Sequence, residues 1–196
     1  MRLALSKRFR GLFWTQLLGA FNDNFLKYAL LILIVFKGFG NLSMSKEELS
    51  EIATAIFIVP FFLFSATAGQ LADKYDKARL IQRLKIVELV IAALAGFGFF
   101  FHSVPALFGS LALLGLQSTF FGPLKYGIIP QLLKTEDLVE GNAAVETGTK
   151  LSILLGTISG GLLAETEHAE LFCSLAVFLV ALSGYCLLYT SPSPRD

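Results

Sequence analysis

Long apolar runs separated by short polar breaks dominate the chain. Each run is close to the ~20 residues that a helix needs to cross the hydrocarbon core of a bilayer. The runs are Gly11–Phe36, Glu51–Leu71, Leu84–Phe101, Val104–Phe121, Asn142–Ala164 and Ala169–Tyr189. They are continuous, whereas the strands of a membrane barrel would alternate apolar and polar residues. The pattern predicts an all-α membrane protein with six transmembrane helices.

Composition narrows the class further. Hydrophobic residues make up 55% of the 196 residues and charged residues only 16%, compared with roughly 25% charged residues in soluble domains. A net charge of +1 leaves no basic face for nucleic acid. The cysteines and histidines are two of each and are not spaced as metal ligands or as a disulfide framework. We expect no metal and no cofactor.

Lysine and arginine fall mainly on one side of the predicted membrane. One side holds eleven of them, namely Arg2, Lys7, Arg8, Arg10, Lys74, Lys77, Arg79, Arg83, Lys85, Lys125 and Lys134, with Lys85 placed in the break after the second run and Lys125 after the fourth run. The other side holds Lys37 and Lys46, together with acidic residues after the fifth run. Cytoplasmic loops carry the excess of basic residues, so both ends of the bundle are predicted to be cytoplasmic.

The last seven residues differ from what precedes them. The stretch "TSPSPRD" at 190–196 is polar and contains two prolines, after an apolar run that ends at Tyr189. We expect residues 1–189 to form the helical bundle and 190–196 to be a linker or a non-native tail. We also expect the chain to be a fragment of a longer protein.

The stretch "GAFNDNFLKYAL" places polar residues inside the first apolar run. Asp23 lies roughly 18 Å along this helix, near the middle of the membrane. An ionised carboxylate at that depth costs at least ~2.5–3.5 kcal/mol, so Asp23 should face the bundle interior or a hydrated cavity. Two interpretations remain open. Asp23 and Lys27 could neutralise each other one turn apart, or Asp23 could line a polar site with Asn22 and Asn24. The flanking amides favour the site.

Two other runs contain charged residues. Glu88 in the third run is a weaker candidate, and it could pair with Arg83 or Lys85 near the start of its own helix. Glu146 in the fifth run could pair with Lys150, one turn further on.

Helix packing is suggested by small residues and by a proline. Small residues recur every fourth position of the fifth run, at Gly148, Ser152, Gly156 and Gly160. Such a face allows helices to approach closely in a membrane. Pro60 in the second run should kink its helix, which neighbouring helices can accommodate.

The polar break after the second run, "GQLADKYDKARL", resembles the signature loop of the major facilitator superfamily. The residues that fit this pattern are Gly69, Asp73, Lys74, Lys77 and Arg79. From their positions, Gly69 allows close backbone approach and Asp73 is placed to cap the next helix. Asp76 and Ala78 depart from the pattern, since glycine and a second basic residue are usual there. The resemblance implies a role for this loop in the conformational change of a transporter.

The same resemblance implies a fold. Transporters of this superfamily consist of two six-helix bundles, each built from two inverted repeats of three helices. This chain would be the amino-terminal bundle, and the substrate would pass between it and a second bundle.

Three further stretches narrow the resemblance to the lysophospholipid transporter branch of the superfamily. They are "AFNDNFLKYALL", "FFGPLKYGIIPQLL" and "LVEGNAAVETGTKLSILLGTISGG", and the likeness extends over about residues 11–188. It implies a secondary carrier that moves lysophospholipids such as lysophosphatidylethanolamine to the inner leaflet of the bacterial inner membrane. A lysophospholipid acyltransferase/acyl-carrier-protein synthetase, fused or separate, would then restore the second acyl chain.

Candidate substrate-binding residues follow from these stretches. Asp23 would attract the ethanolamine ammonium, and Asn22 and Asn24 would hydrogen-bond phosphate or glycerol. Lys125 would contact the phosphate unless it is an interfacial anchor. We expect Asp23, Lys125 and Glu146 to share one polar cavity.

Other functions explain these sequence features less well. A generic drug or sugar transporter would share the loop at Gly69 but has no reason to carry "FNDN" and "PLKYGIIPQ" together. An enzyme is disfavoured because no catalytic constellation or phosphate loop is present, although an acyltransferase could be fused to the chain. A receptor or scaffold would not need the costly Asp23.

Overall fold

Six α-helices form nearly all of the part of the chain that the structure describes. The computed structural model describes residues 9–37 and 44–189. The elements are α1 (Arg10–Lys37), α2 (Lys46–Lys74), α3 (Lys77–Phe100), α4 (Val104–Leu132), the short 3₁₀ turn η2 (Thr135–Asp137), α5 (Leu138–Ala164) and α6 (Ala169–Tyr189). The prediction of an all-α membrane protein with six helices is confirmed. The tail at 190–196 and the basic residues before Phe9 lie outside the described residues.

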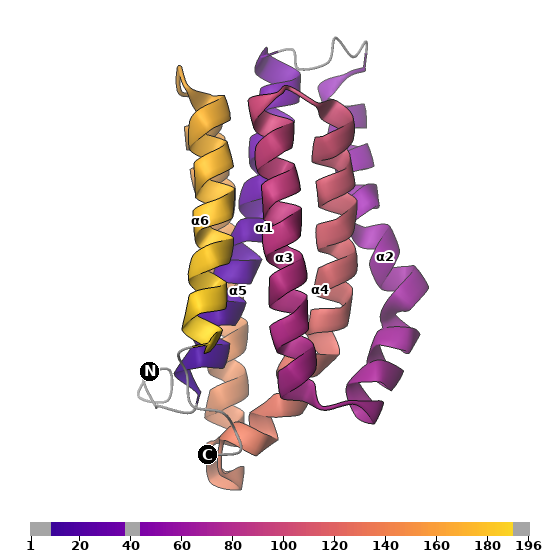
Figure 1. The fold of residues 1–196 in the computed structure, drawn as a ribbon, viewed down its shortest axis with the longest axis vertical. Helices are drawn as coiled ribbons and strands as arrows, with labels where there is room; N and C mark the ends of the chain where they lie inside the picture. Colours follow the sequence, from indigo (N-terminus) through magenta and orange to yellow (C-terminus); the bar gives the residue numbers. More distant parts are fainter. Residues whose placement is uncertain (1–8, 38–43, 190–196) are drawn as a thin grey trace.

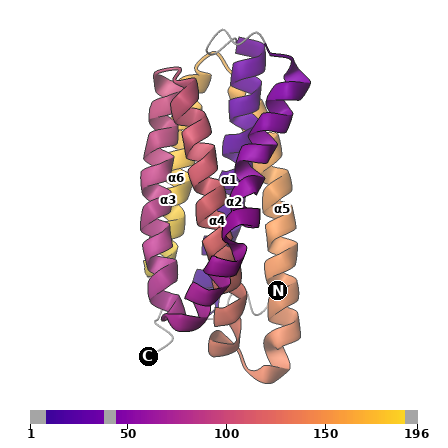
Figure 2. The same cartoon turned by 90° about the vertical axis from the view of Figure 1, so that its right-hand side faces the viewer.

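The helices run up and down along one long axis (Figures 1 and 2). The connections after α2 and α4 lie at one end of the bundle, and those after α3 and α5 lie at the other (Figure 1). By length and composition, α1, α2, α4 and α6 are each able to cross a membrane. In contrast, α3 carries buried Lys85 and Glu88, and α5 is rich in small residues.

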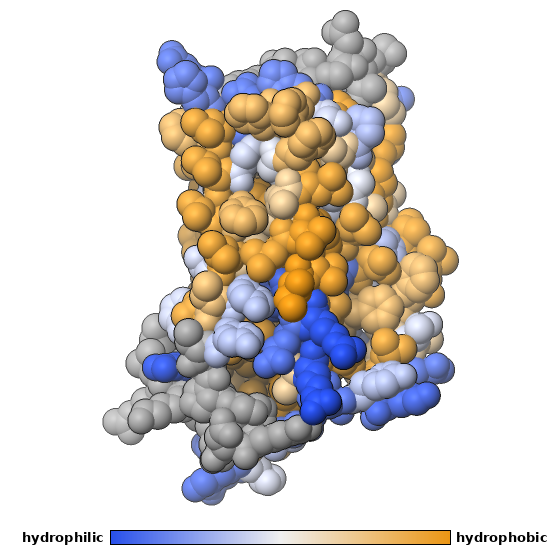
Figure 3. Space-filling view, in the orientation of Figure 1, coloured by the Kyte–Doolittle hydropathy of each residue, from blue (hydrophilic) through white to orange (hydrophobic). Residues whose placement is uncertain are grey.

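The outer surface matches a bilayer. Apolar side chains cover the middle of the face seen in Figure 3, and hydrophilic side chains gather towards its two ends. At the lower end, the hydrophilic surface extends over the beginning of α3, where Arg79, Gln82 and Arg83 are exposed. Large apolar side chains such as Phe62 and Val90 are mostly exposed on the outer surface, at 82% and 66% of their area. A protein with this surface is a multi-pass membrane protein.

The helix neighbours are symmetric. The main packed pairs are α1 with α5, α2 with α4, and α3 with α6, followed by α3 with α4 and α1 with α6. Suppose that α1, α2 and α3 exchange places with α4, α5 and α6, in that order. The pair α1–α5 then becomes α4–α2, and the pair α3–α4 becomes α6–α1. This exchange is what two inverted repeats of three helices require, and it agrees with the architecture that the signature loop implies.

Glycines allow α1 and α5 to touch backbone to backbone. A Cβ atom at Gly156 would lie 2.4 Å from the carbonyl oxygen of Phe21, and one at Gly160 would lie 2.6 Å from that of Phe25. Ser152 lies on the same buried face. The predicted close helix approach is confirmed. Because the space is filled by main-chain atoms, no side-chain rotation can relieve a larger residue there.

Several helices extend further than the apolar runs of the sequence, and for α3 and α4 this places charged residues inside a helix. Helix α4 continues through Pro123 and Pro130 to Leu132 rather than ending near Phe121, as membrane helices with packed neighbours tolerate. Helix α3 begins at Lys77 rather than Leu84. Lys85 and Lys125 therefore lie inside helices, and counting them among loop cations was wrong. Helix α2 also runs on through Pro60, and its ribbon bows outward at mid-length (Figure 1).

The connection between α2 and α3 is shorter than the predicted loop. Asp76, not Asp73, is the N-cap of α3, and its carboxylate accepts a hydrogen bond of 2.9 Å from the backbone N–H of Arg79. Asp73 instead belongs to the last turn of α2, because that helix extends to Lys74. A Cβ at Gly69 would meet no atom within 4 Å, so the expected close approach at Gly69 does not occur among the described residues.

Replacing Gly156 should destabilise the bundle. We expect Gly156→Ala to lower the free energy of unfolding by roughly 1–3 kcal/mol, because the added methyl group overlaps the backbone of α1. Thermal unfolding of the purified protein in detergent measures this effect. Gly161→Ala is the matched control on the same helix, since its Cβ would meet nothing within 4 Å. Equal melting temperatures for the two variants would contradict the α1–α5 contact.

Candidate functional site

A polar cavity of about 230 Å³ lies among helices α1 to α5. The charged side chains of the lining come from α1, α3 and α4, aromatic ones come from α2 and α4, and α5 contributes one polar and one apolar side chain. The lining residues are Gln16, Gly19, Ala20, Asp23, Asn24, Phe57, Phe61, Lys85, Glu88, Gln117, Ser118, Phe121, Gly122, Lys125, Thr149 and Ile153. Four charged residues in a membrane-embedded cavity are costly, and such groups mark functional sites in membrane proteins.

Helical spacing explains how α1 and α4 form the polar walls. On α1, Gln16, Ala20 and Asp23 follow one another at three- and four-residue intervals, so they share one face. On α4, Ser118 and Lys125 lie two turns apart and also share a face. Two polar stripes thus face each other across the cavity.

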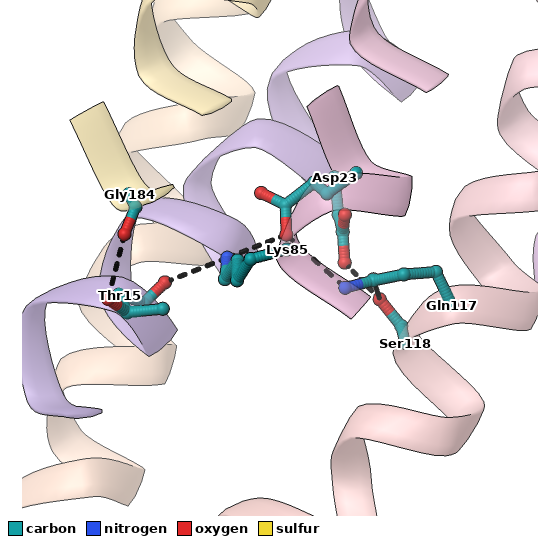
Figure 4. A network of polar contacts seen from close by, with 7 residues as sticks. Thr15, Asp23, Lys85, Gln117, Ser118 and Gly184 are labelled. Carbon is teal, nitrogen blue, oxygen red and sulfur yellow. Dashed lines mark hydrogen bonds and ion pairs between the residues drawn. The ribbon is translucent and has the colours of Figure 1, made fainter. Parts of the chain in front are cut away.

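Polar contacts link α3 to α4 and α4 to α1 in the cavity (Figure 4). Lys85 Nζ lies 2.6 Å from Glu88 Oε2, and Gln117 Nε2 donates to the same oxygen at 3.2 Å. Ser118 Oγ donates its one proton to Asp23 Oδ2 at 2.6 Å, and Gln117 Oε1 lies 3.4 Å from the same hydroxyl as a second, more distant acceptor. Two carboxylates that are far apart in sequence thus lie on either side of neighbouring polar residues of α4.

The ion pair on α3 is also attached to α1 and α6. Lys85 Nζ donates to the carbonyl oxygen of Thr15 at 3.2 Å, and Thr15 Oγ1 donates to that of Gly184 at 2.9 Å (Figure 4). Lys85 Nζ also lies 5.5 Å from the centre of the Phe121 ring. Gly19 provides the space, because a Cβ there would sit 3.1 Å from Lys85 Nζ.

The predicted pair of Asp23 and Lys27 is not formed among the described residues. Asp23 accepts its hydrogen bond from Ser118 of α4. Lys27 Nζ instead lies 5.8 Å from the centre of the Tyr28 ring, and Lys27 does not line the cavity. Asp23 faces the cavity, as the interpretation as a polar site required.

The two asparagines beside Asp23 differ. Asn24 lines the cavity and donates from Nδ2 to the carbonyl oxygen of Ala20 at 2.9 Å. Asn22 is 1% exposed and outside the lining, and neither polar atom of its side chain has a hydrogen-bond partner among the described residues. The expectation that Asn22 lines the site is wrong. Successive residues point about 100° apart on a helix, so three in a row cannot all face one cavity.

Lys125 lines the cavity together with Asp23, but Glu146 does not. Glu146 is exposed, and its Oε1 accepts a hydrogen bond from the hydroxyl of Tyr126. No ion pair between Glu146 and Lys150 is found within the described residues. The reason is the packing of α5, which turns its small residues towards α1 and leaves Glu146 on the outer side. The prediction that all three residues share one cavity is therefore wrong for Glu146, although Lys125 lies within electrostatic range of both Glu146 and Asp23.

Glu88 pairs with Lys85, one of the two partners that the sequence left open, and both residues line the cavity. Other polar residues of the site were not anticipated from sequence. They are Gln16, Gln117, Ser118 and Thr149, and Gln16 Nε2 donates to Thr149 Oγ1 at 3.1 Å. The signal was present in α4, where Gln117 and Ser118 interrupt an apolar run about two turns before Lys125.

The arrangement offers groups of both charges and apolar surface to a ligand. Within residues 9–37 and 44–189, no group of three or more His, Cys, Asp or Glu side chains is placed to hold a metal ion. The cavity offers a carboxylate at Asp23, an ammonium group at Lys125 and aromatic walls at Phe57 and Phe61. An apolar helix bundle with a charged internal cavity is the architecture of a membrane carrier.

The sequence matches the Major Facilitator Superfamily over residues 12–196. The chain therefore belongs to this family of transporters.

Several curated proteins that are similar to this chain carry the name lysophospholipid transporter LplT. The chain is 30% identical to the one from Escherichia fergusonii over 184 residues, which cover 94% of the chain and 41% of the relative. It is 32% identical to the one from Serratia proteamaculans over 177 residues, covering 90% of the chain and 42% of the relative. It is 32% identical to the one from an Enterobacter species over 181 residues, covering 92% and 43%. The chain thus spans about two fifths of the length of these relatives.

Replacing one residue of the Lys85–Glu88 ion pair should destabilise the bundle more than replacing both. We expect Lys85→Met or Glu88→Leu alone to destabilise the bundle by about 3–5 kcal/mol, because each leaves one buried charge without its partner. The double variant K85M/E88L should recover most of this loss, since no isolated charge remains. Thermal unfolding in detergent compares the three variants. A double variant as unstable as the sum of the two singles would contradict this account of the pair.

Proposed function

We propose that this chain is the amino-terminal half of a lysophospholipid transporter. The complete protein would move lysophospholipids such as lysophosphatidylethanolamine from the outer to the inner leaflet of the bacterial inner membrane. A lysophospholipid acyltransferase/acyl-carrier-protein synthetase, fused or separate, would then add the second acyl chain. The chain itself would bind and carry, without catalysing a reaction.

The observation that carries this proposal is the cavity shared by Asp23 and Lys125. A lysophosphatidylethanolamine headgroup bears an ammonium group and a phosphate, so a carboxylate and a lysine in one cavity match it with opposite charges. Asn24 adds an amide for the phosphate or glycerol oxygens, and Phe57 and Phe61 offer apolar walls for the hydrocarbon. The names of the similar transporters support the same ligand.

A carrier of another small solute is the second candidate, because the superfamily signature alone does not specify a substrate. Lysophospholipid transport is favoured because it explains both the charged cavity and the three stretches that resemble lysophospholipid transporters. In either case the missing cavity wall would come from a second six-helix bundle, and the short α2–α3 connection with Lys74, Lys77 and Arg79 would take part in the conformational change.

We also propose the orientation of the bundle. The end that carries the α2–α3 connection and η2 faces the cytoplasm, because basic residues concentrate there. Lys74, Lys77 and Arg79 lie at this end, whereas the α5–α6 connection carries Glu165 and Glu167.

Neutralising either charge of the cavity should impair transport. We expect Asp23→Asn and Lys125→Gln in the full-length protein to lower uptake of radiolabelled lysophosphatidylethanolamine by spheroplasts roughly tenfold or more, because a charge-assisted hydrogen bond to the headgroup is lost. Glu167→Gln, an exposed loop change, is the control. Absence of uptake by the unaltered full-length protein would reject lysophospholipid transport. Undiminished uptake by both cavity variants would reject the assigned headgroup site.

Labelling from outside should reveal the orientation. In a background in which Cys173 and Cys186 are replaced by alanine, we expect Glu167→Cys to react with a membrane-impermeant maleimide in intact spheroplasts. Glu136→Cys in η2 should react only after the membrane is opened, because that end is cytoplasmic. Mass spectrometry of the purified protein measures the labelled fraction. The reverse pattern would show that the bundle is inverted.

A further inference from the structure

Lys27 is a charged residue inside the membrane-spanning part of α1 that has no partner of opposite charge. The apolar span of α1 extends from Arg10 to Ile34, and Lys27 is half-buried within it. Among the described residues, Lys27 forms neither an ion pair nor a hydrogen bond, and its Nζ lies 5.8 Å from the centre of the Tyr28 ring. A ring at this distance attracts the ammonium group weakly and leaves its charge in place. Because a charge is costly inside a membrane, a partner for Lys27 is expected.

Helical geometry places Lys27 on the face of α1 that lines the cavity. At about 100° per residue, Lys27 lies about 40° around the helix from Asp23, about 60° from Asn24 and about 20° from Ala20. These three residues line the cavity. Lys27 therefore continues the same face by one turn, towards the end of the bundle that carries the α3–α4 and α5–α6 connections (Figure 1).

Lys27 is too far from this end of the bundle to reach water there. Every residue of α1 from Ala29 to Phe36 is apolar, and Leu30 and Ile34 are buried in the apolar core. A lysine side chain extends ~6 Å, whereas the end of the apolar span is ~10 Å away by helical rise. The Cα–Cβ bond of a helical residue also tilts towards the N-terminal end, which for Lys27 is the side of Asp23. An interfacial anchor therefore does not account for this lysine.

Asp23 and Lys27 lie side by side without neutralising each other. An acidic residue four positions before a lysine is the favourable order for an ion pair on one helix, and the two Cβ atoms are then ~5–6 Å apart. Asp23 nevertheless accepts its hydrogen bond from Ser118 of α4, at 2.6 Å. A carboxylate and an ammonium group are thus presented together on the cavity face, where a third molecule can contact both.

A zwitterionic headgroup is complementary to these two charges. In phosphoethanolamine a short ethylene linker joins the ammonium group to the phosphate, so an ammonium group held at Asp23 leaves the phosphate within about one helical turn of it. Lys27 lies ~6 Å from Asp23 along the helix axis. Lys125 follows Ser118 by about two turns on α4, which runs opposite to α1, so it lies on the other side of Asp23. Two lysines therefore flank one carboxylate along the bundle.

We propose that Lys27 is a second phosphate-binding residue of the headgroup site, on the outer side of Asp23. It binds the phosphate of a lysophospholipid that enters from the outer leaflet, while Asp23 holds the ammonium group. Lys125 flanks Asp23 on the inner side. This inference rests on the proposed function and orientation, and it adds to them a residue outside the lining of the cavity.

Uptake kinetics of the full-length transporter test this role. Lys27→Met removes the charge and keeps a long side chain, and Lys27→Arg keeps the charge. Lys134→Gln, at an exposed lysine after α4, is the control. The KM and kcat for radiolabelled lysophosphatidylethanolamine are measured in spheroplasts, together with the folded yield in detergent.

We expect the KM of Lys27→Met to exceed those of Lys27→Arg and Lys134→Gln roughly tenfold, because a charge-assisted contact with the phosphate is lost. The kcat values and folded yields should be similar. A KM for Lys27→Met equal to that of the control would overturn the proposal. An equally raised KM for Lys27→Arg would also overturn it, because packing rather than charge would then be responsible.

Labelling of the unaltered full-length protein gives a test that needs no folded variant. The N-hydroxysuccinimide ester of acetic acid acetylates lysine amines, and mass spectrometry gives the rate at Lys27 in the purified protein. We expect lysophosphatidylethanolamine to slow this reaction several-fold. Monoacylglycerol, which lacks the phosphate, and inorganic phosphate at the same concentration should leave the rate unchanged.

The other labelling outcomes contradict the proposal. Slow acetylation that no ligand changes would show that Lys27 pairs with a carboxylate elsewhere in the transporter. Equal protection by monoacylglycerol would show shielding by the acyl chain, and equal protection by inorganic phosphate would show a site for the free ion. Absence of lysophospholipid uptake by the unaltered protein rejects the proposed function, whereas uptake that is insensitive to Lys27→Met rejects only the role of Lys27.

Discussion

The buried ion pair of Lys85 and Glu88 is the interaction on which the arrangement of the bundle depends. A charged pair in the interior of a membrane protein is costly unless further donors and acceptors stabilise it. Here Lys85 Nζ has a partner on α1, the Thr15 carbonyl, and Glu88 Oε2 has one on α4, Gln117, whereas Glu88 Oε1 has no hydrogen-bond partner among the described residues. These contacts tie α3 to α1 and to α4 at one level of the bundle.

Glycine provides the complementary constraint. Gly156 and Gly160 bring α5 onto the backbone of α1, and Gly115 brings α4 within contact of the Phe57 carbonyl on α2. Contacts of this kind are shape-specific and do not depend on water, so they are effective in lipid, where no hydrophobic force drives helices together. Close α1–α5 and α2–α4 pairs leave the intervening space for the charged residues. The same helices thus use one face for close backbone packing and another face for the polar and charged residues of the cavity.

The sequence predicts the fold well and the site only in part. The lengths of the six apolar runs and the four-residue spacing of the small residues in α5 reflect the local geometry of a helix. Both can therefore be recognised from the sequence alone. Partners such as Ser118 for Asp23 depend on how helices rotate about their axes, and that information is spread over the whole bundle. Lys85 lies inside α3, although lysine in a membrane protein usually indicates a loop. Asn22 lies outside the cavity, although it is next to Asp23 in the sequence, because neighbouring residues of a helix point in different directions.

The long sequence separation of the polar partners has a consequence for biosynthesis. Asp23 and Ser118 are 95 residues apart, and Gln16 and Thr149 are 133 apart. At ribosomal speeds of about 5–20 residues per second, the first helix exists for on the order of ten seconds before its partners emerge. During that interval its carboxylate has to be sheltered by the insertion machinery or remain near the interface. The order of synthesis therefore leaves the polar side chains of the first helix without these partners until α4 and α5 have been made.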